Sequence, residues 1–141
     1  MTTAPPTERG RLDSAAPEAV DRLCSELRTG LLAGLPARER FIVELLVREA
    51  LMNSVAHGSG GARRGEIHYE IRPVPGGMMI RVTDDGSGFD WRGWQEGGYQ
   101  PLAESGRGLH IFHLYAHRVQ FFGNGNRVEL IRIFAKGELS G

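Results

Sequence analysis

Apolar residues recur at helical spacing in three stretches of the chain. The first covers residues 17–31, where Pro17 suits the first turn of a helix. The second and longest covers residues 38–57 and is followed by a glycine cluster at residues 58–61, which is typical of a helix end. The third covers residues 108–117. The pattern therefore predicts two helices in the first half of the chain and one in the second half.

Apolar and polar residues alternate in four other stretches, as in half-buried strands. Residues 66–72 and 78–83 flank a turn rich in proline and glycine, and residues 119–122 and 127–135 flank a Gly-Asn-Gly-Asn turn. Each pair predicts an antiparallel hairpin. Residues 84–106 carry many glycines and few periodic apolar residues, which predicts a long loop. The order of elements predicts an α+β fold in which helices cover one face of a mixed, mostly antiparallel sheet.

Length and composition fit one globular domain. The chain has 141 residues, of which 40% are hydrophobic and 24% are charged, so it is long enough to bury a core of its own. We predict a single domain over residues 14–141. Residues 1–13 mix proline, threonine, arginine and glutamate without periodicity, and we expect them to form a mobile lead-in.

Charge and cysteine content limit the binding partners and the cellular compartment that we expect. The 17 basic and 17 acidic residues give no formal net charge, which argues against nucleic acid or an anionic membrane as the main partner. The single cysteine, Cys24, allows no internal disulfide. No apolar stretch approaches the length of a membrane span, and the first residues do not resemble a signal sequence. We therefore expect a cytoplasmic protein with no direct nucleic-acid or membrane partner.

Two polar residues, Glu49 and Asn53, interrupt the long second helix, which is otherwise largely apolar. Residues four apart lie on the same face of a helix, and His57 extends this polar stripe by another turn. Desolvating an amide-like group without a partner costs about 2–7 kcal/mol, so both side chains need partners. Taken alone, the pair is compatible with a structural role, such as bonding a neighbouring strand or loop.

A second motif, Asp84-x-Gly86-x-Gly88, follows the strand predicted over residues 78–83. A carboxylate at a buried strand end can accept a hydrogen bond from an exocyclic amine. Residues without Cβ let the backbone pass close to a flat ring. The motif also has a plain structural interpretation, in which the aspartate bonds its own turn and the glycines allow the turn to form.

A third motif, Gly106-Arg107-Gly108-Leu109, leads directly into the third predicted helix. The free amides and the positive dipole end of a helix N-terminus favour an anion, and an arginine can add a charge-assisted hydrogen bond. The motif thus indicates a phosphate site. The alternative is that the glycines only allow a loop to turn into a helix.

Taken in order, the three motifs resemble the N box and the two glycine boxes of the GHKL ATPase superfamily. Within it, residues 49–58 (EALMNSVAHG) and 106–111 (GRGLHI) resemble the anti-sigma-factor serine/threonine kinases. The resemblance extends over residues 15–136. It implies the two-layer α/β sandwich known as the Bergerat ATP-binding fold, with ATP and Mg²⁺ held between the helix layer and a lid.

The resemblance also implies roles for the polar residues. Asn53 would be the Mg²⁺ ligand, and a carbonyl oxygen suits a hard cation. Glu49 would be the catalytic general base that accepts the proton of a serine hydroxyl. Asp84 would bind the adenine amine.

The remaining residues of the implied nucleotide site come from the glycine boxes and are Gly86, Gly88, Gly106, Gly108 and Leu109. The first two glycines would shape the adenine pocket, and the other two would bring backbone amides to the phosphates. A contact from Arg107 to the terminal phosphates is our inference from its charge and position.

The resemblance implies a Mg-ATP-dependent serine/threonine protein kinase that acts as an anti-sigma factor or partner-switching regulator. Its partners would be a sigma factor, a phosphorylatable antagonist of the STAS type, or both, and relatives of this size are commonly homodimers. One alternative is a module that binds ATP and gates a protein partner without phosphoryl transfer. Another is the catalytic domain of a histidine kinase, although no pair of dimerisation helices precedes residue 15.

Overall fold

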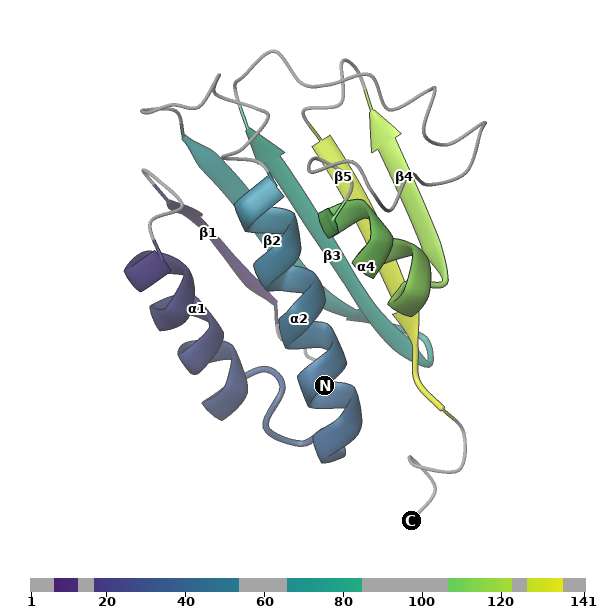
Figure 1. Ribbon diagram of the computed structural model, residues 1–141. Coiled ribbons are helices and arrows are strands. Elements are labelled where there is room, and N and C mark those ends of the chain that lie inside the picture. The colour runs from purple at the N-terminus through teal and green to yellow at the C-terminus, as the bar shows by residue number, and fades with distance from the viewer. Residues whose placement is uncertain (1–6, 13–16, 54–65, 85–106, 123–126, 136–141) are drawn as a thin grey trace, which may run out of the picture.

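The structure is a computed structural model that describes residues 7–12, 17–53, 66–84, 107–122 and 127–135. Within these residues, three helices lie together over one face of a five-stranded sheet (Figure 1). In chain order, the elements are β1 (Glu8–Leu12), α1 (Pro17–Thr29), α2 (Ala37–Asn53), β2 (Ile67–Val74), β3 (Gly77–Asp84), α4 (Arg107–Tyr115), β4 (Arg118–Phe122) and β5 (Arg127–Ile133). This arrangement confirms the predicted α+β fold.

The strands follow the order β1-β2-β3-β5-β4, and each neighbouring pair among them is antiparallel. Both predicted hairpins, β2–β3 and β4–β5, are confirmed. The chain leaves β3, forms α4 on the helix side and then enters edge strand β4. As a result, β5 pairs with β3 in the interior of the sheet.

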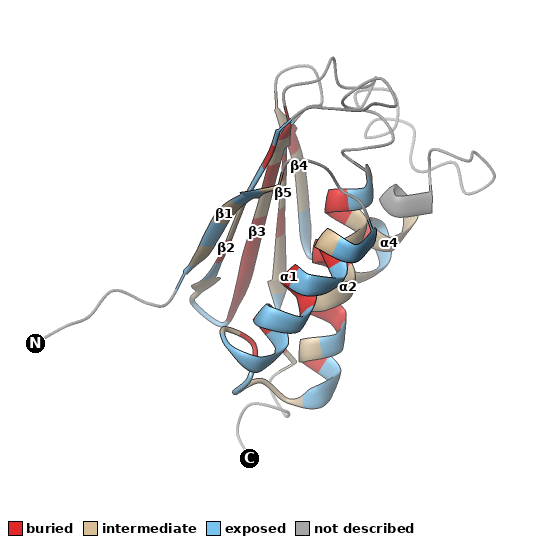
Figure 2. Ribbon diagram, turned by 90° about the vertical axis from the view of Figure 1, so that its left-hand side faces the viewer, coloured by how far each residue is buried: buried red, intermediate tan, exposed pale blue. Residues whose placement is uncertain are grey.

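The core lies between the two layers, where Figure 2 shows buried segments of the helices and strands facing each other. α1 buries the apolar stripe that its periodicity predicts, namely Val20, Leu23, Cys24 and Leu27. Ile71, Ile80 and Leu130 of the middle strands are fully buried, as is Phe112 of α4. Burying one large apolar side chain contributes about 1.5–3 kcal/mol, so this shared core holds the two layers together.

The turn between β2 and β3 depends on glycine. Gly76 has a φ of +72°, a conformation that residues with a Cβ rarely adopt. Its carbonyl oxygen accepts a hydrogen bond from the amide of Phe134, at 2.8 Å. At Gly77, an added Cβ would lie 2.1 Å from the backbone oxygen of Arg132. The turn is therefore closely packed against the end of β5.

The prediction of a mobile lead-in over residues 1–13 was wrong for Glu8–Leu12, which form edge strand β1. β1 has one large apolar residue, Leu12, so its sequence lacks the alternation that marks a half-buried strand. The segment is a strand because its backbone pairs with that of β2, and its own sequence pattern does not indicate one. Gly10 lies opposite Tyr69, whose ring occupies the space that a Cβ at Gly10 would need.

Charged side chains connect the helices along their exposed edges. Arg28 of α1 donates two hydrogen bonds to the carboxylate of Glu44 on α2. Arg48 of α2 donates one to Asp21 of α1 at 2.6 Å. Pairs as exposed as these add little stability, so they orient α1 against α2 while the apolar core supplies most of the stability.

One ion pair is buried at the end of the helix layer where α2 begins. The carboxylate of Glu39 is fully buried and accepts hydrogen bonds from Arg132 of β5 at 2.9 and 3.0 Å. The same guanidinium donates to the backbone oxygen of Tyr115, at 3.1 Å, where α4 ends. The hydrogen bonds from Arg132 hold the pKa of Glu39 below its ordinary value. This pair joins α2, α4 and β5.

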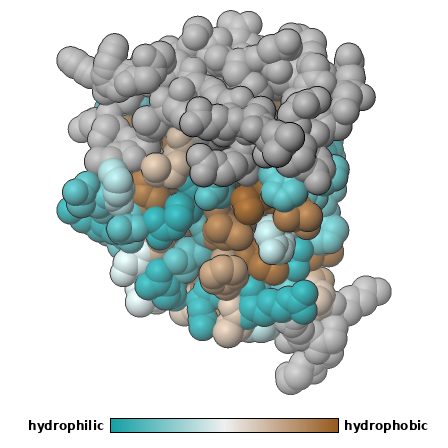
Figure 3. Space-filling model, in the orientation of Figure 1, coloured by the Kyte–Doolittle hydropathy of each residue, from teal (hydrophilic) through white to brown (hydrophobic). Residues whose placement is uncertain are grey.

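The helix layer leaves some apolar surface uncovered. In the space-filling view, hydrophobic side chains (brown) lie next to hydrophilic ones (teal) over α2 and α4 (Figure 3). Phe41 of α2 is 65% exposed and Leu114 of α4 is 54% exposed. None of the helices within the described residues is both long and apolar enough to span a bilayer.

Candidate functional site

Three elements that carry predicted site residues end or begin at the same end of the molecule. α2 and β3 finish there and α4 starts there, as both ribbon views show (Figures 1 and 2). α2 also packs directly against α4 and against β3. The fold therefore brings together the described residues of all three motifs, although they lie far apart in the sequence.

Glu49 and Asn53 lie in the last turns of α2. Val47, Ala50 and Leu51 of the same helix are fully or almost fully buried, so packing fixes how this part of the helix is turned. Glu49 is half-buried. Asn53 is the last residue of α2. The predicted continuation of the helix to His57 lies outside the described residues.

Asp84 is the last residue of β3 and pairs with Ile67 of β2. It lies on the same side of the strand as Ile80 and Val82, because alternate residues face the same way, and these residues face the helices. Asp84 is only 5% exposed. A carboxylate so deeply buried must be paired or hydrogen-bonded, and Asp84 does have such an interaction. These properties match the predicted buried carboxylate at a strand end.

α4 begins at Arg107 and has nine residues, so Arg107, Gly108 and Leu109 form its first turn. This confirms that the third motif opens a helix. The first amides of a helix lack intrahelical partners and carry a partial positive charge, which suits a phosphate. Gly86, Gly88 and Gly106 lie outside the described residues, so their roles stay predictions.

The described part of the site fits the chemistry of ATP. It offers a buried carboxylate for an amine-bearing base and a helix N-terminus for phosphates, and α2 ends at Asn53, the predicted ligand of a hard cation. The carboxylate of Glu49 adds a group that can accept a proton. The assignments of Asn53 to Mg²⁺ and of Glu49 to catalysis remain predictions.

Sequence reasoning did not anticipate the polar side of the sheet near this site. Thr83 precedes Asp84 and points to the opposite face, where its hydroxyl accepts a hydrogen bond from Arg127 at 3.2 Å. The guanidinium of Arg127 also lies over the ring of Phe122, 6.0 Å from its centroid. The signal for this surface lies in the polar positions of the alternating strands.

Comparison with known families agrees with this geometry. The profile of the histidine kinase-like ATPase domain matches residues 14–132, which include every described residue of the candidate site. The chain therefore belongs to the histidine kinase-like ATPase domains, and membership implies ATP binding and confirms the predicted GHKL superfamily. Among curated proteins, no match was found. Assignment to the anti-sigma-factor kinases stays a prediction.

Proposed function

We propose that the protein is a Mg-ATP-dependent serine/threonine protein kinase that acts as an anti-sigma factor or partner-switching regulator. Its substrate in this proposal is a serine of an antagonist protein of the STAS type. The observation that carries the proposal is the position of Glu49, one turn before Asn53, on a helix that ends beside β3 and the start of α4. A domain that only binds nucleotide has no need of a base at that position.

In the proposed reaction, a serine hydroxyl oxygen forms a bond to the terminal phosphorus of ATP. The bond from that phosphorus to the bridging oxygen breaks, and ADP leaves. Glu49 accepts the proton of the hydroxyl as the new bond forms. Reactions of this kind ask the protein mainly to position groups and to offset negative charge. A half-buried carboxylate on a packed helix is held in place and can still be approached.

The other site residues bind and orient. Asp84 would accept a hydrogen bond from the adenine amine. Its burial favours that role, because a desolvated carboxylate binds a base with a hydrogen-bond donor much more tightly than a base without one. The first amides of α4 and Arg107 would contact the phosphates. Asn53 would hold Mg²⁺, which would offset charge on the phosphates.

Label transfer tests the proposal. The protein is incubated with ATP labelled in the γ-phosphate and with a STAS-type antagonist encoded near its gene. We expect label on one serine of the antagonist, and replacing that serine with alanine should abolish it. ATP binding without any transfer would contradict the kinase proposal and favour the ATP-gated binding module.

Nucleotide titration tests the binding roles separately. We expect Asn53→Ala to weaken Mg-ATP binding while leaving the affinity for metal-free ATP nearly unchanged, because only the metal contact is lost. Asp84→Asn should weaken ATP and ADP alike, because adenine is common to both. Unchanged affinity of Asn53→Ala for Mg-ATP would exclude the ligand role.

A further inference from the structure

The face of the sheet opposite the helices is rich in arginine, and we call it the open face. Successive residues of a strand point to opposite faces of the sheet. The open face therefore carries Glu70, Arg81, the residues that pair with them on neighbouring strands, and every second residue along each strand from these positions. Its charged residues on the strands are Arg9, Arg11, Arg72, Arg81, Arg118, Arg127, Glu70 and Glu129. Six arginines of the strands therefore face two glutamates of the strands, and Glu66, which directly precedes β2, adds a third carboxylate on the same side.

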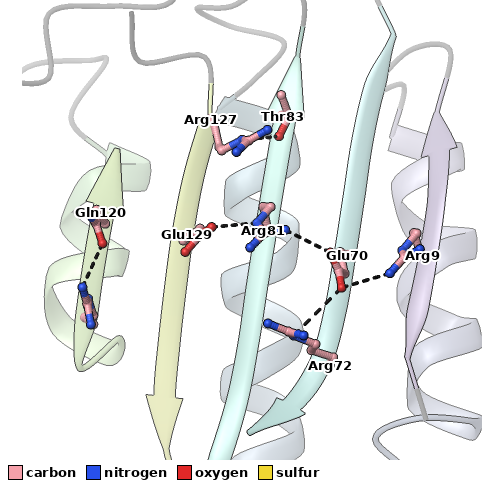
Figure 4. A network of polar contacts seen from close by, with 9 residues as sticks. Arg9, Glu70, Arg72, Arg81, Thr83, Gln120, Arg127 and Glu129 are labelled. Carbon is pink, nitrogen blue, oxygen red and sulfur yellow. Dashed lines mark hydrogen bonds and ion pairs between the residues drawn. The ribbon is translucent and has the colours of Figure 1, made fainter. Parts of the chain in front are cut away.

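Both glutamates lie in one row that crosses the sheet, and the register pairs Arg9, Glu70, Arg81 and Glu129 in succession. Figure 4 looks onto this row with the helices behind the sheet. Arg81 lies between the carboxylates, with N···O distances of 2.7 Å to Glu129 and 3.2 Å to Glu70. Arg9 contacts the other oxygen of Glu70 at 3.3 Å. The carboxylates of Glu70 and Glu129 are thus already engaged within this row, and the carboxylate of Glu66 is engaged by Arg11 at 3.2 Å.

Among the described residues, the rows on either side contain arginine but no carboxylate of their own, although Glu66 contacts Arg11 from just beyond the end of one row. On the side of the candidate site, the register places Arg127 between Thr83 and Phe122. On the other side, Ile131 is flanked by Met79 and Arg118. Arg127 donates to the Thr83 hydroxyl, and Arg118 donates to the side-chain oxygen of Gln120 at 3.0 Å. Both arginines are exposed, and within the part of the chain that the structure describes each donates to a neutral group and pairs with no carboxylate.

The helix side of the molecule differs, because there the charges neutralise one another. Arg28 pairs with Glu44, and Arg48 pairs with Asp21. The neutral total charge of the chain therefore hides a positive excess on the open face. A partner that meets this face gains most if its own surface is acidic.

We propose that the open face is a docking surface for an acidic protein. Apolar side chains lie among its arginines at the surface: Phe122 is partly exposed and Ile133 is 42% exposed, whereas Met79 on the same face is buried. Arginine and aromatic residues are enriched in protein–protein interfaces, and this face offers both. This mixture favours a protein over nucleic acid, which is usually met by a surface with fewer apolar residues.

Binding of fluorescein-labelled poly-L-glutamate, followed by fluorescence anisotropy at low salt, tests the proposal. Arg118→Gln/Arg127→Gln removes two exposed charges that pair with no carboxylate among the described residues, so folding should be preserved. The matched control is Arg22→Gln/Arg38→Gln on the helix side. We expect the open-face variant to bind about tenfold more weakly and the control to stay within about twofold of the wild type. Rising salt should reduce the difference.

Three outcomes would overturn the proposal. The first is no binding of poly-L-glutamate to the wild type, and the second is an equal loss in both double variants. The third is tighter binding of a single-stranded oligonucleotide that the open-face variant loses, which would assign the surface to nucleic acid. The experiment contains no nucleotide substrate, so its failure would leave the proposed phosphoryl transfer untouched.

Discussion

The two ends of α2 each carry a glutamate, and the two residues differ in what surrounds them. Glu39 is fully buried and receives two hydrogen bonds from Arg132. Glu49 is half-buried, and within the described residues its carboxylate makes no hydrogen bond or ion pair. One carboxylate is used to join three elements of the fold, whereas the other can meet a ligand. The same residue type on one helix therefore serves stability at one end and, as we propose, chemistry at the other.

Among variants that test this difference between the two ends of α2, we expect Glu39→Ala to cause the largest loss of stability. Removing one partner of a buried pair leaves an uncompensated charge and costs about 3–5 kcal/mol, so the free energy of unfolding in urea should fall by that amount. Glu49→Ala should change it by less than about 0.5 kcal/mol, as is usual away from buried networks.

Glu44→Ala is the control for this comparison, because Glu44 also pairs with an arginine, but at the surface. Its cost should not exceed about 1 kcal/mol. Equal losses in Glu39→Ala and Glu49→Ala would show that the contrast between the two ends does not exist.

A smaller loss is expected from Gly77→Ala, which probes the packing near the Glu39 end. The added Cβ would lie 2.1 Å from the backbone oxygen of Arg132, so β5 must shift at the residue that pairs with Glu39. Overpacking of this kind typically costs about 1–3 kcal/mol. The midpoint of urea unfolding measures it, with Gly34→Ala as the control because its Cβ would meet nothing within 4 Å. Equal midpoints for the two variants would contradict the close packing.

The smallest expected effect is a change in the stability contributed by the Glu39–Arg132 pair at acidic pH. Arg132 lowers the pKa of Glu39 from 4.5, so the ionised pair contributes its full stability above that value. The contribution falls as the pH drops below 4.5 and through the lowered pKa of the folded protein. The difference in unfolding free energy between the wild type and Glu39→Gln should therefore be constant near neutrality and shrink in acid. A difference that grows in acid would mean that the pKa is raised.

The fold and the candidate site were predictable from sequence where the signal is local. Helical periodicity identified α1 and α2, and Asp84 was recognisable because a strand pattern stops immediately before it. The Glu39–Arg132 pair was missed, since the two residues are 93 positions apart and Glu39 resembles any acidic residue in a first helical turn. β1 was missed because its pairing with β2, rather than its own pattern, makes it a strand.

The role of Glu49 is the central claim, and Glu49→Gln tests it most directly when compared with Glu44→Gln on the same helix. Two quantities are measured for each variant, the affinity for ATP and the rate of label transfer to the antagonist serine. For Glu49→Gln we predict an ATP affinity within about twofold of the wild type and transfer reduced by at least about 100-fold, as expected for loss of a general base. Glu44→Gln should retain both. Transfer by Glu49→Gln at the rate of the wild type would contradict the account.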